Sequence, residues 1–229
     1  MEDIDQLIQD FKKSFQACNN PDLLKLHSQF ESLTQQNPKL KRKLDFAEYN
    51  RFKSELAYLS TVLEYLEATD WHIVTESEGI KVQARGSGNE FFTKCEVTVN
   101  QNIFKTLSVL SAVDLVTTWV SVCTKIEVLA EPTITRKLTK FHFWFPWPLA
   151  NRQCVIEFNA FPIPRERACL ITMRTPESEN YLGHKIPPFA EGEVKMWVRI
   201  GCLYSQIVDE NTTKIIFLAS ADGNIVTPK

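Results

Sequence analysis

The spacing of hydrophobic residues changes once along this chain of 229 residues, near Asp70. Before that point apolar side chains recur at helical spacing, and after it they alternate with polar ones. Helices followed by alternating segments predict an α+β fold, a long antiparallel sheet with helices on one side. With 44% hydrophobic residues and a net charge of -2, the chain resembles neither a disordered protein nor one that binds the nucleic-acid backbone.

Three helices are predicted in the first 68 residues. Their apolar stripes are Ile4, Leu7, Ile8, Phe11 and Phe15, then Leu23, Leu26, Phe30 and Leu33, and finally Phe52, Leu56, Leu59, Leu63 and Leu66. The sequence "NNPD" at 19–22 supplies a stop and a new helix cap. The basic run "KLKRK" at 39–43 is interpreted as a solvated linker, with contact to anionic lipid headgroups as the alternative.

Alternating strands are expected after residue 70. Three strands come first, two of which form a hairpin around the turn "GSGN"; one or two short helices follow within 102–122, and about six more strands complete the sheet. The connection from Thr175 to Gly192 contains three prolines. Loops of that length are uncommon unless they serve a site.

Signatures of enzymes are missing from the sequence. It has no GxSxG, no HExxH and no glycine-rich phosphate loop, and its four histidines lack metal-ligand spacing. We therefore expect no catalysis, no cofactor and no bound metal. The six cysteines are scattered through apolar runs without a CxxC pair, which is typical of a reduced, cytoplasmic protein. No apolar run is long enough to span a bilayer, so any membrane contact should be transient and peripheral.

The most unusual segment is "TKFHFWFPWPLANRQCV", which places five aromatic residues among seven positions between 141 and 147. Its core, "FPWPLANR", resembles the "PWPLSNRD" element of START domains, the steroidogenic-acute-regulatory-related lipid-transfer family, and most closely that of the phosphatidylcholine-transfer branch. Four other segments resemble START elements in the same order: "TDWHIVTESEGIKVQAR", "DLVTTWV", "GEVKMWVRIGCLYSQI" and "TKIIFLASADGNIVTPK". The resemblance covers residues 45–229 and leaves 1–44 as an N-terminal helical extension.

The resemblance implies a helix-grip fold, in which a curved antiparallel sheet wraps around a C-terminal helix and encloses one lipid. Two departures stand out: Gln153 replaces the family's Asp, and the chain ends at Lys229, where the lid helix would follow. We expect that helix to be absent and the cavity to be covered by the N-terminal helices or another subunit.

The function implied is non-enzymatic binding of one lipid, a phospholipid being one candidate, for transfer or sensing. The alternative is a helix-grip scaffold without lipid, whose N-terminal helices bind a protein partner. A related enzyme, such as a cyclase, is disfavoured because no acid–base pair can be placed in the cavity.

Alternation predicts which side chains line the cavity. Phe141 and Phe143 should point inward on one strand, and Cys154, Ile156 and Phe158 on the next, although plain core packing is the alternative for each. Trp144 and Trp147 belong to a loop at the mouth, where amphipathic rings suit a membrane interface.

The strand at 193–208 has two possible phases. The hydrophobic pattern points Val194, Met196 and Val198 inward, whereas the START resemblance implies that Trp197, Arg199 and Leu203 point inward. An inward Arg199 beside Trp197 would anchor a lipid phosphate, because a buried guanidinium requires an anion. The alternative is a solvated Arg199 on the outer face.

Overall fold

A computed structural model describes residues 4–87, 90–189 and 191–222. Parts of two predicted turns lie outside these residues, namely positions 88–89 of "GSGN" and the segment after Asp222. The chain divides into two compact units, Met1–Glu67 and Ala68–Lys229. Each unit has its own core.

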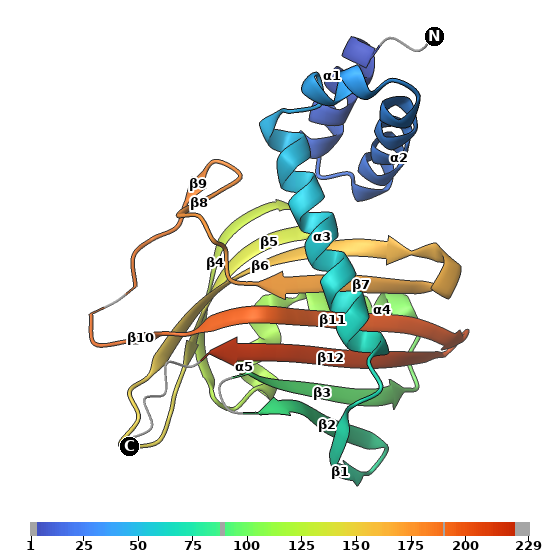
Figure 1. Cartoon of the computed structure of the whole chain (residues 1–229). Helices are drawn as coiled ribbons and strands as arrows, with labels where there is room; N and C mark the ends of the chain where they lie inside the picture. The colour runs from blue at the N-terminus through green and yellow to red at the C-terminus, as the bar shows by residue number, and fades with distance from the viewer. Residues whose placement is uncertain (1–3, 88–89, 190, 223–229) are drawn as a thin grey trace. The chain divides into compact units, whose positions relative to one another are not determined.

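The N-terminal unit is helical, as predicted (Figure 1). It contains α1 (Ile4–Gln16), α2 (Asn20–Gln36), the 3₁₀ helix η1 (Pro38–Arg42) and α3 (Ala47–Glu67). The predicted "NNPD" signal is confirmed, because the Asn19 side chain accepts a hydrogen bond from the backbone N–H of Asp22 and caps α2.

Aromatic rings fill the core of this unit. The Phe11 ring is fully buried, with its centroid 5.6 Å from that of Phe30 and 5.6 Å from that of Phe52. Tyr49 meets Phe11 edge-on at 5.3 Å. Since Tyr49 and Phe52 belong to α3, this helix forms one compact unit with α1 and α2. The division expected after residue 44 would have separated α3 from these two helices.

The second unit is built on one large curved sheet, so the predicted α+β class is confirmed (Figure 1). In the order in which they pair, its antiparallel strands are β1 (His72–Ser77), β2 (Ile80–Ser87), β3 (Glu90–Val99), β12 (Thr212–Asp222), β11 (Trp197–Asp209), β7 (Ala168–Arg174), β6 (Arg152–Ile163), β5 (Arg136–Phe143) and β4 (Cys123–Thr133). The short β10 (Val194–Lys195) pairs with β6 in parallel, and β8 (Asn180–Tyr181) forms a small hairpin with β9 (His184–Lys185).

Short helices lie against one face of this sheet, which we call the inner face (Figure 1). They are α4 (Ile103–Ser111), the 3₁₀ turn η2 (Val113–Leu115) and α5 (Val116–Trp119). Asn102 begins α4 by accepting a hydrogen bond from the Lys105 backbone N–H at 2.9 Å. The 3₁₀ turn η3 (Pro164–Glu166) joins β6 to β7.

The opposite, outer face is covered over β4, β5 and β6 by the long connection after Thr175. Tyr181 from this connection is 1% exposed and packs with Ala130, Leu138 and Val155. The sheet therefore has apolar clusters on both faces, and the long connection belongs to the folded core.

None of the described helices combines the length and apolar character needed to cross a membrane.

Candidate ligand-binding hollow

An apolar hollow of about 460 Å³ lies on the inner face of the sheet, between the strands and the α4–α5 segment. The helical segment contributes Leu110, Val113, Val116, Trp119 and Val120, and the sheet contributes Phe141, Phe143, Ile156, Phe158, Met173, Met196, Val198, Leu203, Phe217, Ala219 and Ala221. Among the residues that the structure describes, no charged side chain belongs to this lining. The hollow therefore suits an apolar group, which would gain about 25 cal/mol for each Å² removed from water.

Three phenylalanines form one wall of the hollow. The rings of Phe141 and Phe143 stack with centroids 6.0 Å apart, and Phe158 is tilted against Phe141 at 6.1 Å. Successive inward positions on β5 bring the first two rings together, and Phe158 stands on the neighbouring strand β6. The expected inward orientation of Phe141, Phe143, Ile156 and Phe158 agrees with the lining of the hollow.

Cys154 lies behind this wall. Its side chain is fully buried in the core cluster that contains Phe141 and Ile156, and it is not among the lining residues. Burial raises the pKa of the Cys154 thiol to about 11. This thiol is therefore a packing group.

Strand β11 changes phase part-way along its length, because its pairing with β12 shifts between Val198 and Ile200. Before this bulge Val198 points into the hollow, and after it Leu203 does. An extra residue in one strand reverses the alternation on either side of it. Each of the two phases considered for this strand therefore holds for one part of it.

Trp197 and Arg199 do not point into the hollow, contrary to what the resemblance implied. The Arg199 guanidinium lies 2.9 Å from the Asp222 carboxylate and is 59% exposed. Trp197 lines a different pocket, beside Lys195. The reason is the bulge, which leaves both residues out of phase with Leu203.

The loop between β5 and β6 is folded, and its tryptophans point to solvent. Trp147 is 92% exposed and Trp144 is 52% exposed. The backbone N–H of Trp144 donates to the Val122 carbonyl at 2.8 Å, which ties the loop to the segment that carries Trp119. Trp119 lines the hollow and is itself exposed, so it stands at the mouth.

Arg152 at the base of this loop has a structural role. Its guanidinium donates to the Ala150 carbonyl and stacks 5.0 Å from the centroid of the Phe145 ring. Gln153, which replaces the acidic residue of the START element, is fully buried on β6, and its carbonyl accepts a hydrogen bond from Met196.

Known structures with the same architecture were found for most of the chain. Human StAR-related lipid transfer protein 5 superposes with a TM-score of 0.62 at 16% identity, covering 77% of this chain and 84% of that one. Human STARD10 gives a TM-score of 0.61 at 18% identity, over 74% and 68% of the two chains. The chain has the START fold.

A STAR-related lipid transfer protein from Xanthomonas axonopodis extends this likeness to a bacterial protein, with a TM-score of 0.58 at 19% identity over 67% of this chain and 82% of that one. No family model matches the sequence, and no curated protein matches it. The likeness therefore rests on the arrangement of the START fold.

The lining of the START-fold hollow contains residues that the sequence did not indicate. Ala219 and Ala221 leave space on β12, and Val113, Val116 and Val120 form the opposite wall. Small side chains carry no signal of a cavity in an alternating strand, and the short helical turns have no regular apolar stripe. Within the described ranges, no group of three or more His, Cys, Asp or Glu side chains is placed to hold a metal ion.

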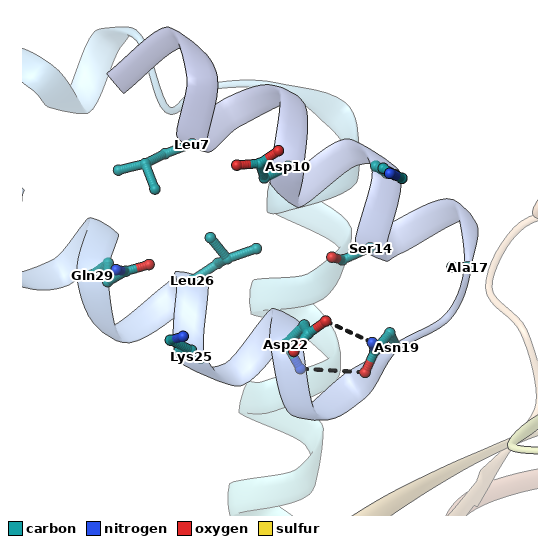
Figure 2. A pocket seen from close by; sticks show the side chains of 10 residues that line it. Leu7, Asp10, Ser14, Ala17, Asn19, Asp22, Lys25, Leu26 and Gln29 are labelled. Atoms are coloured by element: carbon teal, nitrogen blue, oxygen red, sulfur yellow. Dashed lines mark hydrogen bonds between the residues drawn. The ribbon is translucent and has the colours of Figure 1, made fainter. Parts of the chain in front are cut away.

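A second pocket, of about 500 Å³, lies in the N-terminal unit between α1 and α2 (Figure 2). Leu7 and Leu26 face one another across it, and Asp10 and Lys25 stand on its walls. Asn19 donates to the Asp22 carboxylate at its far end. Its mixed polar and charged walls contrast with the apolar lining of the hollow.

Proposed function

We propose that this protein binds one lipid in the hollow on the inner face of its sheet, without catalysing a reaction, and carries or senses that lipid. The observation that carries the proposal is a space of about 460 Å³ whose walls, over the described parts of the chain, bear no charged side chain. Pockets of roughly 300–1,000 Å³ are typical of small-molecule sites. The lipid-transfer names of the proteins with the same fold support the proposal. A cytoplasmic location is part of it, since all six cysteines are free.

The ligand is held mainly through its acyl part in this proposal. The arginine expected to bind a phosphate pairs with Asp222 away from the hollow. A phospholipid would therefore leave its headgroup near the mouth, where Trp119 is exposed.

The protein would collect its lipid through transient contact with a membrane. Trp144 and Trp147 are exposed on a loop bonded to the segment of Trp119, and indole rings favour the interface between headgroups and acyl chains. Brominated phosphatidylcholine vesicles test this contact by quenching tryptophan fluorescence. Trp147→Ala should lose most of the quenching, and equal quenching of both proteins would contradict the contact.

Native mass spectrometry tests lipid binding itself. The full-length protein is incubated with phosphatidylcholine vesicles, re-isolated and weighed, with one bound lipid as the expected result. Ala219→Phe fills the hollow and should abolish the adduct. Thr98→Phe adds the same ring at an exposed position of β3 on the outer face and should retain it. A wild-type protein that takes up no lipid would overturn the proposal.

The second candidate is a scaffold that binds a protein partner through its N-terminal helices. The observation in its favour is the groove between α1 and α2, where Leu7 and Leu26 are flanked by side chains of both signs. Removal of charge by Asp10→Asn and Lys25→Gln should weaken such a partner without affecting lipid uptake. Uptake of lipid by the protein in the absence of a partner would contradict the scaffold as its only function.

A further inference from the structure

A third pocket, on the outer face of the sheet, is independent of the hollow. It has a volume of about 450 Å³ and lies under the long connection that follows Thr175. Its apolar lining includes Val155, Ile186 and Phe189, and its edge carries Trp197. The lipid proposal gives this pocket no role, and long ordered connections commonly serve a site.

Two ammonium groups flank one aromatic ring in this pocket. The Nζ of Lys195 lies 4.8 Å from the centroid of Phe189 and 3.5 Å from that of Trp197. The Nζ of Lys140 lies 5.5 Å from the same Phe189 centroid. Both distances to Phe189 fall within the range of cation–π attraction, so the rings hold two positive charges near the pocket floor.

Lys140 is a buried cation with few partners. Its residue is 6% exposed, and its Nζ donates to the Pro188 carbonyl at 3.3 Å. Among the residues that the structure describes, no carboxylate lies within ion-pair distance of Lys140. An ammonium has three donors, and burying one without an anion is costly. An anion in the adjoining pocket would offset that cost.

The charged side chains that line this pocket differ in their exposure. Lys195 is half-buried, whereas Glu177, Glu179 and Lys185 are exposed at the rim. Burial lowers the pKa of Lys195, whereas Cys154 and Glu179 act to raise it, so its ammonium has lost part of its hydration. A partly desolvated ammonium gains more from a bound anion than a fully hydrated one, because it has less water to displace.

We propose that this outer pocket binds a small molecule that carries a phosphate or a carboxylate on an aromatic or apolar body. The anionic group contacts Lys195, and the positive charge of Lys140 stabilises it from behind Phe189 and Pro188. The body of the ligand packs on Ile186 and on the Phe189 and Trp197 rings. The site differs from the hollow in its charge and in the face of the sheet on which it lies.

The test uses phenyl phosphate as the probe and the indole N–H signals of the full-length, ¹⁵N-labelled protein as the readout. The chain has five tryptophans, and Trp197→Phe identifies the signal of the pocket. Phenyl phosphate at concentrations up to about 10 mM should shift the Trp197 signal saturably and leave the Trp119 signal unchanged. Benzoate and inorganic phosphate distinguish a carboxylate ligand from a phosphate ligand, and phenol tests the need for an anion.

Four variants make the result specific. Lys195→Met should weaken phenyl phosphate binding by roughly tenfold, and Lys140→Met should weaken it by a smaller factor. Glu179→Gln should strengthen binding, because it removes a negative charge from the rim. Lys105→Met, at an exposed position of α4, is the matched control and should have no effect.

The proposal is overturned if phenyl phosphate produces no saturable shift of Trp197, if phenol binds equally well, or if Glu179→Gln weakens binding. The last result would mean that the rings and glutamates select a cation. Ala219→Phe, which fills the hollow, should leave phenyl phosphate binding unchanged. The proposal for the outer pocket and the lipid proposal are therefore tested independently.

Discussion

The imidazole Nε2 of His142 lies 2.6 Å from Oε1 of Glu127 across the pair of β4 and β5, while Nδ1 of the same ring lies 3.5 Å from Oε2 of Glu193. Glu127 also receives a hydrogen bond from Lys125. The side chains of Lys125 and then His142 lower the pKa of Glu127. One carboxylate thus ties together two neighbouring strands on the outer face.

We expect Glu127→Gln to reduce the free energy of unfolding by about 0.2–1 kcal/mol at neutral pH, as is typical of exposed pairs. Because the pKa of Glu127 is lowered in the folded state, its contribution is complete above the unfolded value of about 4.3 and is lost as the pH falls through the lower, folded value. Urea unfolding from pH 7 to pH 3 measures it. A difference in the free energy of unfolding between wild type and Glu127→Gln that is the same at every pH would contradict this role of the Glu127 carboxylate.

Gly201 cannot accept a side chain without displacing the neighbouring strand. A Cβ at this position would lie 2.9 Å from the Met173 carbonyl oxygen and 3.2 Å from the Met173 Cβ. Gly201→Ala should therefore destabilise the sheet unit by about 1–3 kcal/mol and lower its melting temperature. Calorimetry measures the change, and an unaltered melting temperature would show that the strands separate at no cost.

The buried thiols should resist modification. Burial raises the pKa of Cys154 to about 11 and that of Cys202 to about 12, and thiolates are the reactive form. Iodoacetamide at pH 8 should leave both residues unmodified in the folded protein and label both in urea, as peptide mass spectrometry would reveal. Rapid labelling of Cys154 in the folded state would mean that the wall behind Phe141 opens.

Phe11 should control the stability of the N-terminal unit. Phe11→Ala removes the ring on which Phe30 and Phe52 pack, and we expect it to cost about 3–5 kcal/mol. All five tryptophans lie after residue 67, so circular dichroism at 222 nm follows the helices while tryptophan fluorescence follows the sheet unit. The helical transition should shift more than the fluorescence transition. Equal shifts would contradict separate cores.

The sequence predicted the inner face of β5 and β6 well, because both strands keep a strict alternation. Phe141, Phe143, Ile156 and Phe158 all follow from it. The START resemblance was wrong about Arg199, which the hydrophobic pattern placed on the outer face, and nothing local in the sequence marks the bulge that precedes Ile200. Each of the two predictions for the strand at 193–208 applied one alternation of inner and outer side chains along its whole length.

Other features depend on contacts between distant segments. The grouping of α3 with α1 and α2 follows from the packing of Tyr49 and Phe52 around Phe11, which a helical stripe alone does not specify. The aromatic clamp on Lys195 joins Phe189 to Trp197 across the end of the long connection. The length of that connection indicated a site, but the sequence did not indicate which of its residues would form one.

The bulge in β11 has a consequence for how this strand tolerates change. Arg199 is the extra residue between Val198 and Ile200, which pair with the adjacent residues Ala221 and Ser220 of β12, so loss of Arg199 would leave a regular strand in which Val198 and Leu203 still face the hollow. Point substitutions there adjust the size of the hollow gradually. A one-residue deletion within 200–207, where the pairing with β12 is regular, would instead exchange the inner and outer faces of the residues on one side of it in one step.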